Sequence, residues 1–300
     1  MGAPGPPCDA VAMLLRPALL LLPALLATGA DAPVPAPGWR QGWGLAGPAA
    51  PARASGRMTG QDGVRLQLQP VAGQVQVWAE HQGTGPVQVR LHAGPGSNLV
   101  PVVRELPRPG RWLLATLDGG QRNQRLLLDV VPGPVQPRVD AGHAYALPFD
   151  PATGVRVHQG AHGQASHHDA QNRHAWDFAL PEGTPVLAAR GGRVIAVHAA
   201  SPGPGTRPGD GGNLVRVLHE DGSMAVYAHL QPGSITVAPG QRVVTGQRLA
   251  ASGNTGYSRA PHLHFVVQVN AGLALASIPV QVNGPQGRLL AAGSAVPAPL

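Results

Sequence analysis

The sequence predicts an all-β protein, and three observations lead to this expectation. The 300 residues include 41 glycines and 33 prolines, and both residue types destabilise helix interiors. Hydrophobic residues make up 43% of the chain, enough for a core, while only 12% are charged. Short segments alternate apolar and polar residues with a period of two, which is the pattern of half-buried strands. The length fits one large domain or two of ordinary size.

The first 32 residues are expected to be a secretory signal peptide. Arg16 precedes the apolar run Ala18–Leu26, and small residues suited to cleavage follow around Ala30 and Ala32. The run is too short to span a membrane as a stable helix. The single cysteine, Cys8, lies ahead of the run, so the mature chain has no internal disulfide. We therefore expect an exported protein, periplasmic or secreted, without stable membrane insertion.

Residues 33–62 are rich in Pro, Gly and Ala and are expected to form a loose linker. Five short alternating segments follow within residues 63–140. They are centred on Leu66–Leu68, Val75–Ala79, Val87–Leu91, Trp112–Ala115 and Leu126–Val131. Because these segments are bounded by Gly and Pro, they predict a small β-sandwich. Nothing in this block suggests chemistry, so we expect an accessory module for folding or targeting.

The basic residues exclude several classes of protein. All 22 are arginine, there is no lysine, and the net charge is +7. A lysine Schiff base, a Walker-type phosphate lysine and a biotinyl or lipoyl carrier all need an amine and are therefore excluded. Positive charge suits a polyanionic partner, but a GC-rich coding bias explains the arginine excess equally well. No nucleic-acid partner is expected.

Histidines are concentrated in the C-terminal half of the chain. Ten of the thirteen lie between positions 158 and 264. Two of them belong to the segment Pro261–Val267, which is predicted to be a strand. A period of two places His262 and His264 on one face and the apolar residues on the other. Both imidazoles can therefore reach one small site.

Two further segments carry candidate ligands. Met224–Leu230 is a predicted strand that follows the hairpin signal Glu220–Gly222 and contains His229. Ser166–Phe178 combines histidines with aspartates, and Pro181–Val186 is a predicted turn that leads into another strand. Two histidines and one aspartate, with a fourth position open, are the ligands of a catalytic zinc. A closed site built on cysteines is impossible in this chain.

These blocks together resemble one known family. Residues 145–280 are similar to the M23 (LytM/lysostaphin-type) zinc metallopeptidases, which cut peptide bonds in bacterial peptidoglycan. The resemblance rests on the order and spacing of the segments Ser166–Asp177, Pro181–Val186, Tyr227–Leu230, Val243–Gln247, Gly253–Ser258 and Pro261–Phe265. It implies an antiparallel β domain with a groove across its sheet. We place this peptidase domain at residues 141–285 and a flexible tail at 286–300.

The resemblance also implies roles for individual residues. Asp177 and His264 correspond to zinc ligands, and His262 and His229 to the pair that assists catalysis, with one Zn²⁺ per chain. The commonest family pattern has the first ligand four residues before the aspartate, where this chain has Arg173. The chain is instead similar to a subgroup in which His167 is that ligand.

Two other histidines are alternatives for the first ligand. Neighbouring residues of an extended loop point in opposite directions, so His167 and His168 exclude one another. His174 and Asp177 are separated by an odd number of residues, so an extended segment would place them on opposite faces. Geometry therefore disfavours His174, and the resemblance to the subgroup then implies His167 in place of His168. The remaining histidines of this region, His158, His162, His198 and His219, are expected at the surface or at strand edges.

The predicted function is that of an exported zinc metalloendopeptidase acting on peptidoglycan stem peptides or cross-bridges. Zinc bound by this ligand set lowers the pKa of a bound water toward ~7, and an imidazole beside it can transfer the proton. Peptidoglycan is the expected partner, and a regulatory protein partner is compatible with the sequence. The alternatives are an inactive LytM-like module that binds the cell wall or regulates a partner hydrolase, and a peptidase that processes a secreted protein. The bond cleaved, and whether the domain before residue 140 positions or masks the groove, stay open.

Overall fold

The computed structural model describes residues 58–59, 63–94, 97–118, 125–163, 166–207, 209–284, 290 and 295–296. The expected signal peptide lies outside these residues, as do most of the expected linker and tail. In the described part the only helical element is the 3₁₀ turn η3 (Pro151–Thr153), and all other regular elements are strands. No helix of this part is long and apolar enough to cross a membrane. The all-β expectation is confirmed.

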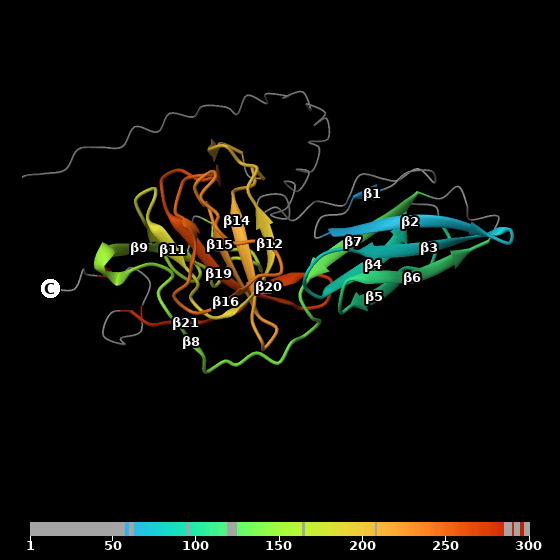
Figure 1. Ribbon diagram of the computed structural model, residues 1–300, viewed down its shortest axis with the longest axis horizontal. Coiled ribbons are helices and arrows are strands. Elements are labelled where there is room, and N and C mark those ends of the chain that lie inside the picture. The colour runs from blue at the N-terminus through green and yellow to red at the C-terminus, as the bar shows by residue number, and fades with distance from the viewer. Residues whose placement is uncertain are drawn as a thin grey trace, which may run out of the picture. The chain divides into compact units, whose positions relative to one another are not determined.

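The N-terminal strands form two antiparallel sheets that share one core (Figure 1). The sheets have the orders β1-β2-β3-β6 and β5-β4-β7. Their strands are β1 (Met58–Thr59), β2 (Val64–Val71), β3 (Gln74–His81), β4 (Val87–Ala93), β5 (Val102–Leu106), β6 (Gly110–Leu117) and β7 (Leu126–Pro132). Alternate residues such as Val64 and Leu66 of β2 and Val89 and Leu91 of β4 enter the same buried cluster. The five predicted strands and the sandwich they predict are confirmed.

Strand β5 was not predicted, and its exposure explains why. It pairs only with β4 and so lies at the edge of its sheet. Only its last residue, Leu106, is fully buried, while Val103 is 50% exposed. An edge strand of this kind buries no regular apolar face, and Pro101 and Pro107 flank it. The alternation that identifies the other strands is therefore missing.

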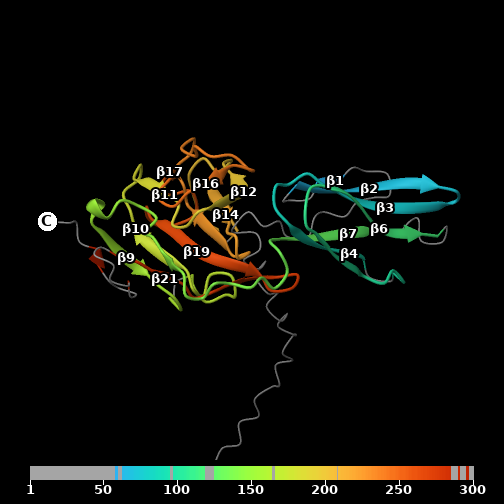
Figure 2. The same ribbon diagram turned by 60° about the horizontal axis from the view of Figure 1, so that its bottom comes forward.

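The C-terminal strands build a nine-stranded sheet in which every pairing is antiparallel (Figures 1 and 2). The order is β16-β12-β14-β15-β19-β10-β9-β22, with β20 beside β19. Its strands are β9 (Val155–Gln159), β10 (Trp176–Ala179), β12 (Gly192–His198), β14 (Leu214–Leu218), β15 (Met224–Ala228), β16 (Arg242–Val243), β19 (Leu263–Asn270), β20 (Leu275–Ser277) and β22 (Ala295–Val296). An antiparallel β domain was expected here, and the structure confirms it.

Strand β19 separates the main core of this domain from the face that carries the histidines. Leu263 and Phe265 belong to the large core cluster beneath the sheet. Val266 lies on the other face in a smaller apolar cluster with Val226 and Ala228 of β15. The period of two predicted from the sequence is therefore confirmed. Because His264 lies between Leu263 and Phe265, its side chain points to the opposite face, away from the large core.

Short elements complete the domain at its margins. They are β8 (Ala144–Tyr145), β11 (Pro185–Leu187), β13 (Pro204–Gly205), β17 (Arg248–Ala251), β18 (Gly256–Tyr257) and β21 (Gln281–Val282). Strand β11 pairs with β17, whereas β13–β18 and β21–β8 are parallel pairs. The predicted turn ahead of β11 is present, with Thr184 N donating to Pro181 O at 3.2 Å and Gly183 at φ +85°. Within the expected tail, Ala295 and Val296 pair with β9.

Candidate metal centre and active site

Two neighbouring strands bring an aspartate beside a histidine. In the pairing of β10 with β19, Asp177 lies directly opposite His264, although the two are 87 residues apart in sequence. Nδ1 of His264 lies 2.8 Å from Oδ1 of Asp177. Both residues are buried, with exposed fractions of 8% for Asp177 and 1% for His264.

His167 reaches the same carboxylate from the loop before β10. The side chain of Asp169 accepts hydrogen bonds from the backbone N–H groups of Gln171 and Asn172 at 2.7 and 2.9 Å, which shapes this loop. Nδ1 of His167 donates to the carbonyl of Gly160 at 2.8 Å. Its other nitrogen, Nε2, lies 3.2 Å from Oδ2 of Asp177. The fully buried imidazole therefore presents its second nitrogen to the carboxylate.

The three side chains form a compact set of possible metal ligands. One ligand atom from each of His167, Asp177 and His264 lies within 4.8 Å of the others, and in the described part no other group of three or more His, Cys, Asp or Glu side chains is so close. Two imidazoles and one carboxylate are the donor set that zinc takes when a position is left for water or substrate. The backbone carbonyl that fixes His167 is the kind of partner that orients a metal-bound histidine. The residues present therefore fit a zinc ion.

The carboxylate of this set is ionised. Burial alone would raise the pKa of Asp177, but hydrogen bonds with His167 and His264, and the charges that these rings can carry, hold that pKa well below its usual value. A buried negative charge needs a compensating cation or hydrogen-bond donors. This electrostatic environment favours the binding of a cation.

A second pair of histidines lies beside the set. The rings of His229 and His262 have their centroids 4.4 Å apart. Nδ1 of His229 donates to Thr255 O at 2.7 Å. Burial, followed by the nearby rings of His262 and His264, lowers the pKa of His229 to about 3, so this ring is neutral near pH 7. Because its proton is on Nδ1, the neutral ring can accept another only at Nε2.

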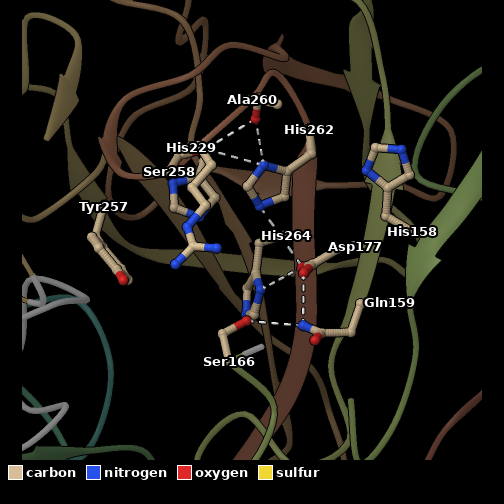
Figure 3. Close-up of a pocket in the computed structure, with 11 residues that line it drawn as sticks. His158, Gln159, Ser166, Asp177, His229, Tyr257, Ser258, Ala260, His262 and His264 are labelled. Carbon is tan, nitrogen blue, oxygen red and sulfur yellow. Dashed lines mark hydrogen bonds and ion pairs between the residues drawn. The ribbon is translucent and has the colours of Figure 1, made fainter. Parts of the chain in front are cut away.

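The ring of His262 is also held by a hydrogen bond from Nδ1 to a backbone carbonyl. Its Nδ1 donates to Ala260 O at 2.9 Å, and Oγ of Ser258 lies 3.2 Å from the same nitrogen. Its Nε2 is directed toward the metal-ligand set, 3.9 Å from Oδ1 of Asp177 (Figure 3). The five residues predicted for the site therefore come together, and both rings of this pair keep Nε2 as the proton-accepting nitrogen.

All of these residues except His167 line one cavity of about 290 Å³ (Figure 3). The sequence analysis assigns no individual role to six other residues that line it, namely Gln159, Ser166, Tyr257, Ser258, Arg259 and Ala260. Nε2 of Gln159 donates to Ser166 Oγ at 2.9 Å and to Asp177 Oδ2 at 3.1 Å. Gln159 lies opposite Asp177 in the pairing of β9 with β10. No local sequence pattern reveals a register between strands, so this residue could not have been found that way.

The alternative first ligands lie elsewhere. His168 is exposed, and Nδ1 of His174 lies 3.0 Å from Ser277 O. Among the other histidines, His158 is exposed but lines the cavity. His219 directly follows the end of β14, yet it is only 3% exposed, so it is not a surface residue. Its ring is held by Gly191 O at 2.8 Å and faces Tyr145.

Comparison with known proteins shows which family the residues of this site resemble. Residues 171–275 match the sequence profile of Peptidase family M23. A stretch of 108 residues is 37% identical to an uncharacterized metalloprotease of Haemophilus influenzae, and covers 36% of this chain and 21% of that protein. Another, of 127 residues, is 35% identical to the peptidoglycan DD-endopeptidase ShyA of Vibrio cholerae, and covers 42% of this chain and 25% of that protein.

A third relative is the glycyl-glycine endopeptidase ALE-1 of Staphylococcus capitis. It is 37% identical over 101 residues, which cover 33% of this chain and 25% of ALE-1. The chain thus spans between a fifth and a quarter of the length of these relatives. The family match contains Asp177, His229, His262 and His264, and begins four residues after His167. Residues 171–275 of this chain are therefore similar to peptidase family M23.

Proposed function

We propose that the protein is an exported zinc metalloendopeptidase that hydrolyses peptide bonds of peptidoglycan stem peptides or cross-bridges. One observation carries this proposal: the candidate ligands His167, Asp177 and His264 lie beside the imidazole pair His229 and His262. Two relatives support this proposal, because one is named a peptidoglycan DD-endopeptidase and the other a glycyl-glycine endopeptidase. Such a substrate lies outside the cytoplasm, which agrees with the proposed signal peptide at residues 1–32.

His167, Asp177 and His264 would hold the zinc ion. Bound there, zinc would supply a Lewis acid that polarises the substrate carbonyl and acidifies water. The ionised Asp177 contributes the negative charge that favours a divalent cation. The hydrogen bond from His167 Nδ1 to Gly160 O places a proton on that nitrogen, so that Nε2, once deprotonated, is the atom of this ring that would bind zinc.

His262 and His229 would handle protons. The Ala260 carbonyl holds the proton of His262 on Nδ1, so Nε2 can take a proton from the attacking water and later return it to the leaving amine. His229 is neutral because it is buried, and its ring lies against that of His262. In its other neutral tautomer, with the proton on Nε2, it could donate to the negative oxygen that develops on the attacked carbonyl.

The domain organisation is part of the proposal. We assign residues 1–32 to a signal peptide, 33–62 to a linker, 63–140 to the accessory sandwich, 141–285 to the peptidase domain and 286–300 to a tail. The accessory domain would position the groove or mask it, and a regulatory protein partner would act through either role.

The test combines zinc content with digestion of purified sacculi. We expect about one zinc per chain and the release of soluble muropeptides whose masses show peptide-bond cleavage. His264→Ala should lose both zinc and activity, whereas His262→Ala should keep zinc and lose activity, and the exposed control His168→Ala should keep both. Zinc lost from His262→Ala but kept in His264→Ala would reverse the two assignments.

Other outcomes would favour the alternatives. Clearly substoichiometric zinc, together with binding to sacculi and no release, would identify an inactive wall-binding module. Full zinc occupancy with cleavage of a secreted protein, but not of sacculi, would identify a processing peptidase.

A further inference from the structure

The segment between β18 and β19 forms one wall of the cavity and is anchored through its backbone. Tyr257 N donates to Asp210 O at 2.9 Å, and Gly256 N to Gly203 O at 3.0 Å. Between the two cavity-lining residues Tyr257 and Arg259, the hydroxyl of Ser258 donates to Ala260 O at 3.0 Å. The backbone that carries Arg259 is therefore held in place before any substrate arrives.

The side chain of Arg259 has no partner within the described part of the chain. It is exposed and lines the cavity, and none of the described residues forms a hydrogen bond or ion pair with its guanidinium group. Arg190, by contrast, is engaged by Asp221 at 2.8 Å, and Arg90 by Asp129. Arg259 therefore presents a guanidinium group whose hydrogen-bond donors are available to a ligand in the cavity.

The positive charge of Arg259 is not neutralised by the other charged residues that line the cavity. Asp177 is the only acidic residue among those that line it. Its carboxylate is already shared by His167, His264 and Gln159. A divalent cation held by this one carboxylate would leave one net positive charge, and Arg259 adds another. The cavity would thus attract an anionic ligand.

We propose that Arg259 is a specificity-determining residue that binds a free carboxylate of the substrate, so that acidic stem peptides are preferred over uncharged glycine bridges. This inference rests on the proposed peptidase function and specifies its substrate class. Guanidinium binds carboxylate through two parallel hydrogen bonds, a geometry that lysine cannot reproduce. Because Arg259 is not among the residues that would hold zinc or move protons, its contribution should lie in substrate binding and appear mainly in KM.

The experiment uses the full-length zinc-loaded protein and two matched substrates. One is a purified stem-peptide dimer with its free carboxylates, and the other is the same dimer with those carboxylates converted to carboxamides; pentaglycine serves as an uncharged reference. The wild type should cleave the carboxylate form with a kcat/KM about tenfold higher, the size expected for one charged hydrogen-bonded pair at a partly solvated site.

Variants at two arginines decide the inference. In Arg259→Gln the ratio between the two dimers should fall toward one, through a higher KM for the carboxylate form, and Arg259→Lys should keep part of the preference. Arg242→Gln is the control, because Arg242 is exposed on β16 and does not line the cavity. It should keep the wild-type ratio.

The outcomes separate this inference from the function on which it rests. If the wild type cleaves both dimers equally, or prefers pentaglycine, the role of Arg259 is refuted and the peptidase function stands. The same holds if Arg259→Gln keeps the wild-type ratio. If the zinc-loaded protein cleaves no peptide at all, the proposed function itself fails.

Discussion

Asp177 is the residue on which the chemistry of the site depends. Its two carboxylate oxygens are within 3.2 Å of nitrogen atoms from His167, His264 and Gln159. These residues come from a loop and from β9 and β19, the two strands that flank β10. One buried carboxylate therefore links every segment that builds the candidate metal centre, and its neighbours can be tested separately.

The first ligand can be identified by alanine substitution at three histidines. His167→Ala should lower zinc affinity strongly, because it removes one of three ligands. His168→Ala and His174→Ala should change it little, because His168 is exposed and His174 is bonded to Ser277. Bound zinc is measured by atomic absorption after dialysis against a weak chelator. Zinc retained in His167→Ala but lost in His174→Ala would overturn the assignment.

Gln159 is expected to act as a positioning residue for the Asp177 carboxylate. Gln159→Leu keeps the size of the side chain but removes the donor to Oδ2 of Asp177. Partners of this kind typically change metal affinity by about 10- to 100-fold when they are removed. Zinc affinity, measured by competition with a chromogenic chelator, should fall within this range.

Ser166→Ala is the matched control for Gln159. It removes the other hydrogen-bond partner of the amide and leaves the bond to Asp177 in place. Its effect on zinc affinity should be clearly smaller than that of Gln159→Leu. Equal losses in the two variants would show that the loop around Ser166, and not the amide, supports the carboxylate.

At the scale of elements, the pairing of β13 with β18 holds the wall of the cavity. Gly256 has a φ of +73°, and a Cβ atom added there would lie 2.3 Å from the backbone nitrogen of Gly212. Gly246 has a similar φ of +81°, but a Cβ atom there would meet nothing within 4 Å. Alanine substitutions at the two glycines therefore distinguish the cost of backbone strain alone from the cost of strain combined with steric overlap.

Alanine substitutions at the two glycines should differ in their effects on the free energy of unfolding and on activity. Gly246→Ala should lower the free energy of unfolding by roughly 1–2 kcal/mol, the cost of a left-handed conformation for a residue with a Cβ. Gly256→Ala should cost more, and should also lower activity, because the shifted backbone carries Ser258 and hence the ring of His262. Chemical denaturation and sacculus digestion measure the two effects. Equal stability losses would mean that the contact with Gly212 relaxes easily.

Much of the strand structure could be predicted because it depends on local pattern. The alternation in β2, β4 and β19 shows which residues are buried, and it separates the face of His264 from that of Phe265. Pairing between strands is not local. The register that places Gln159 and His264 on either side of Asp177 depends on contacts among distant segments. The sequence therefore indicated the ligands through a family resemblance, but not their supporting residue.

For the whole molecule, the half-buried ion pair of Asp221 with Arg190, which lies away from the cavity, should affect stability at low pH. Burial alone would raise the pKa of Asp221, but hydrogen bonds from Ser223 and Arg190 lower it from 3.8 to about 2. Its stabilising contribution is therefore complete above about pH 4 and is lost as the pH falls toward 2. Asp221→Asn should be less stable than the wild type near neutral pH, and this gap should narrow between pH 4 and 2.

Urea denaturation of both proteins at several pH values measures this gap directly. Other acidic groups titrate equally in the two proteins, so their contributions cancel in the difference. A gap that stays constant between pH 6 and 2.5 would contradict the depressed pKa of Asp221.

The two faces of strand β19 limit the sequence changes that this domain can tolerate. The same eight residues supply Phe265 to the core and His264 to the opposite face. A slip of one residue in its pairing would exchange these two side chains, so that stability and activity would be lost together. Single-residue insertions and deletions are therefore excluded from this strand. New substrate preferences would have to arise by substitution in segments outside the strand, such as residues 257–260, while the register of the sheet is preserved.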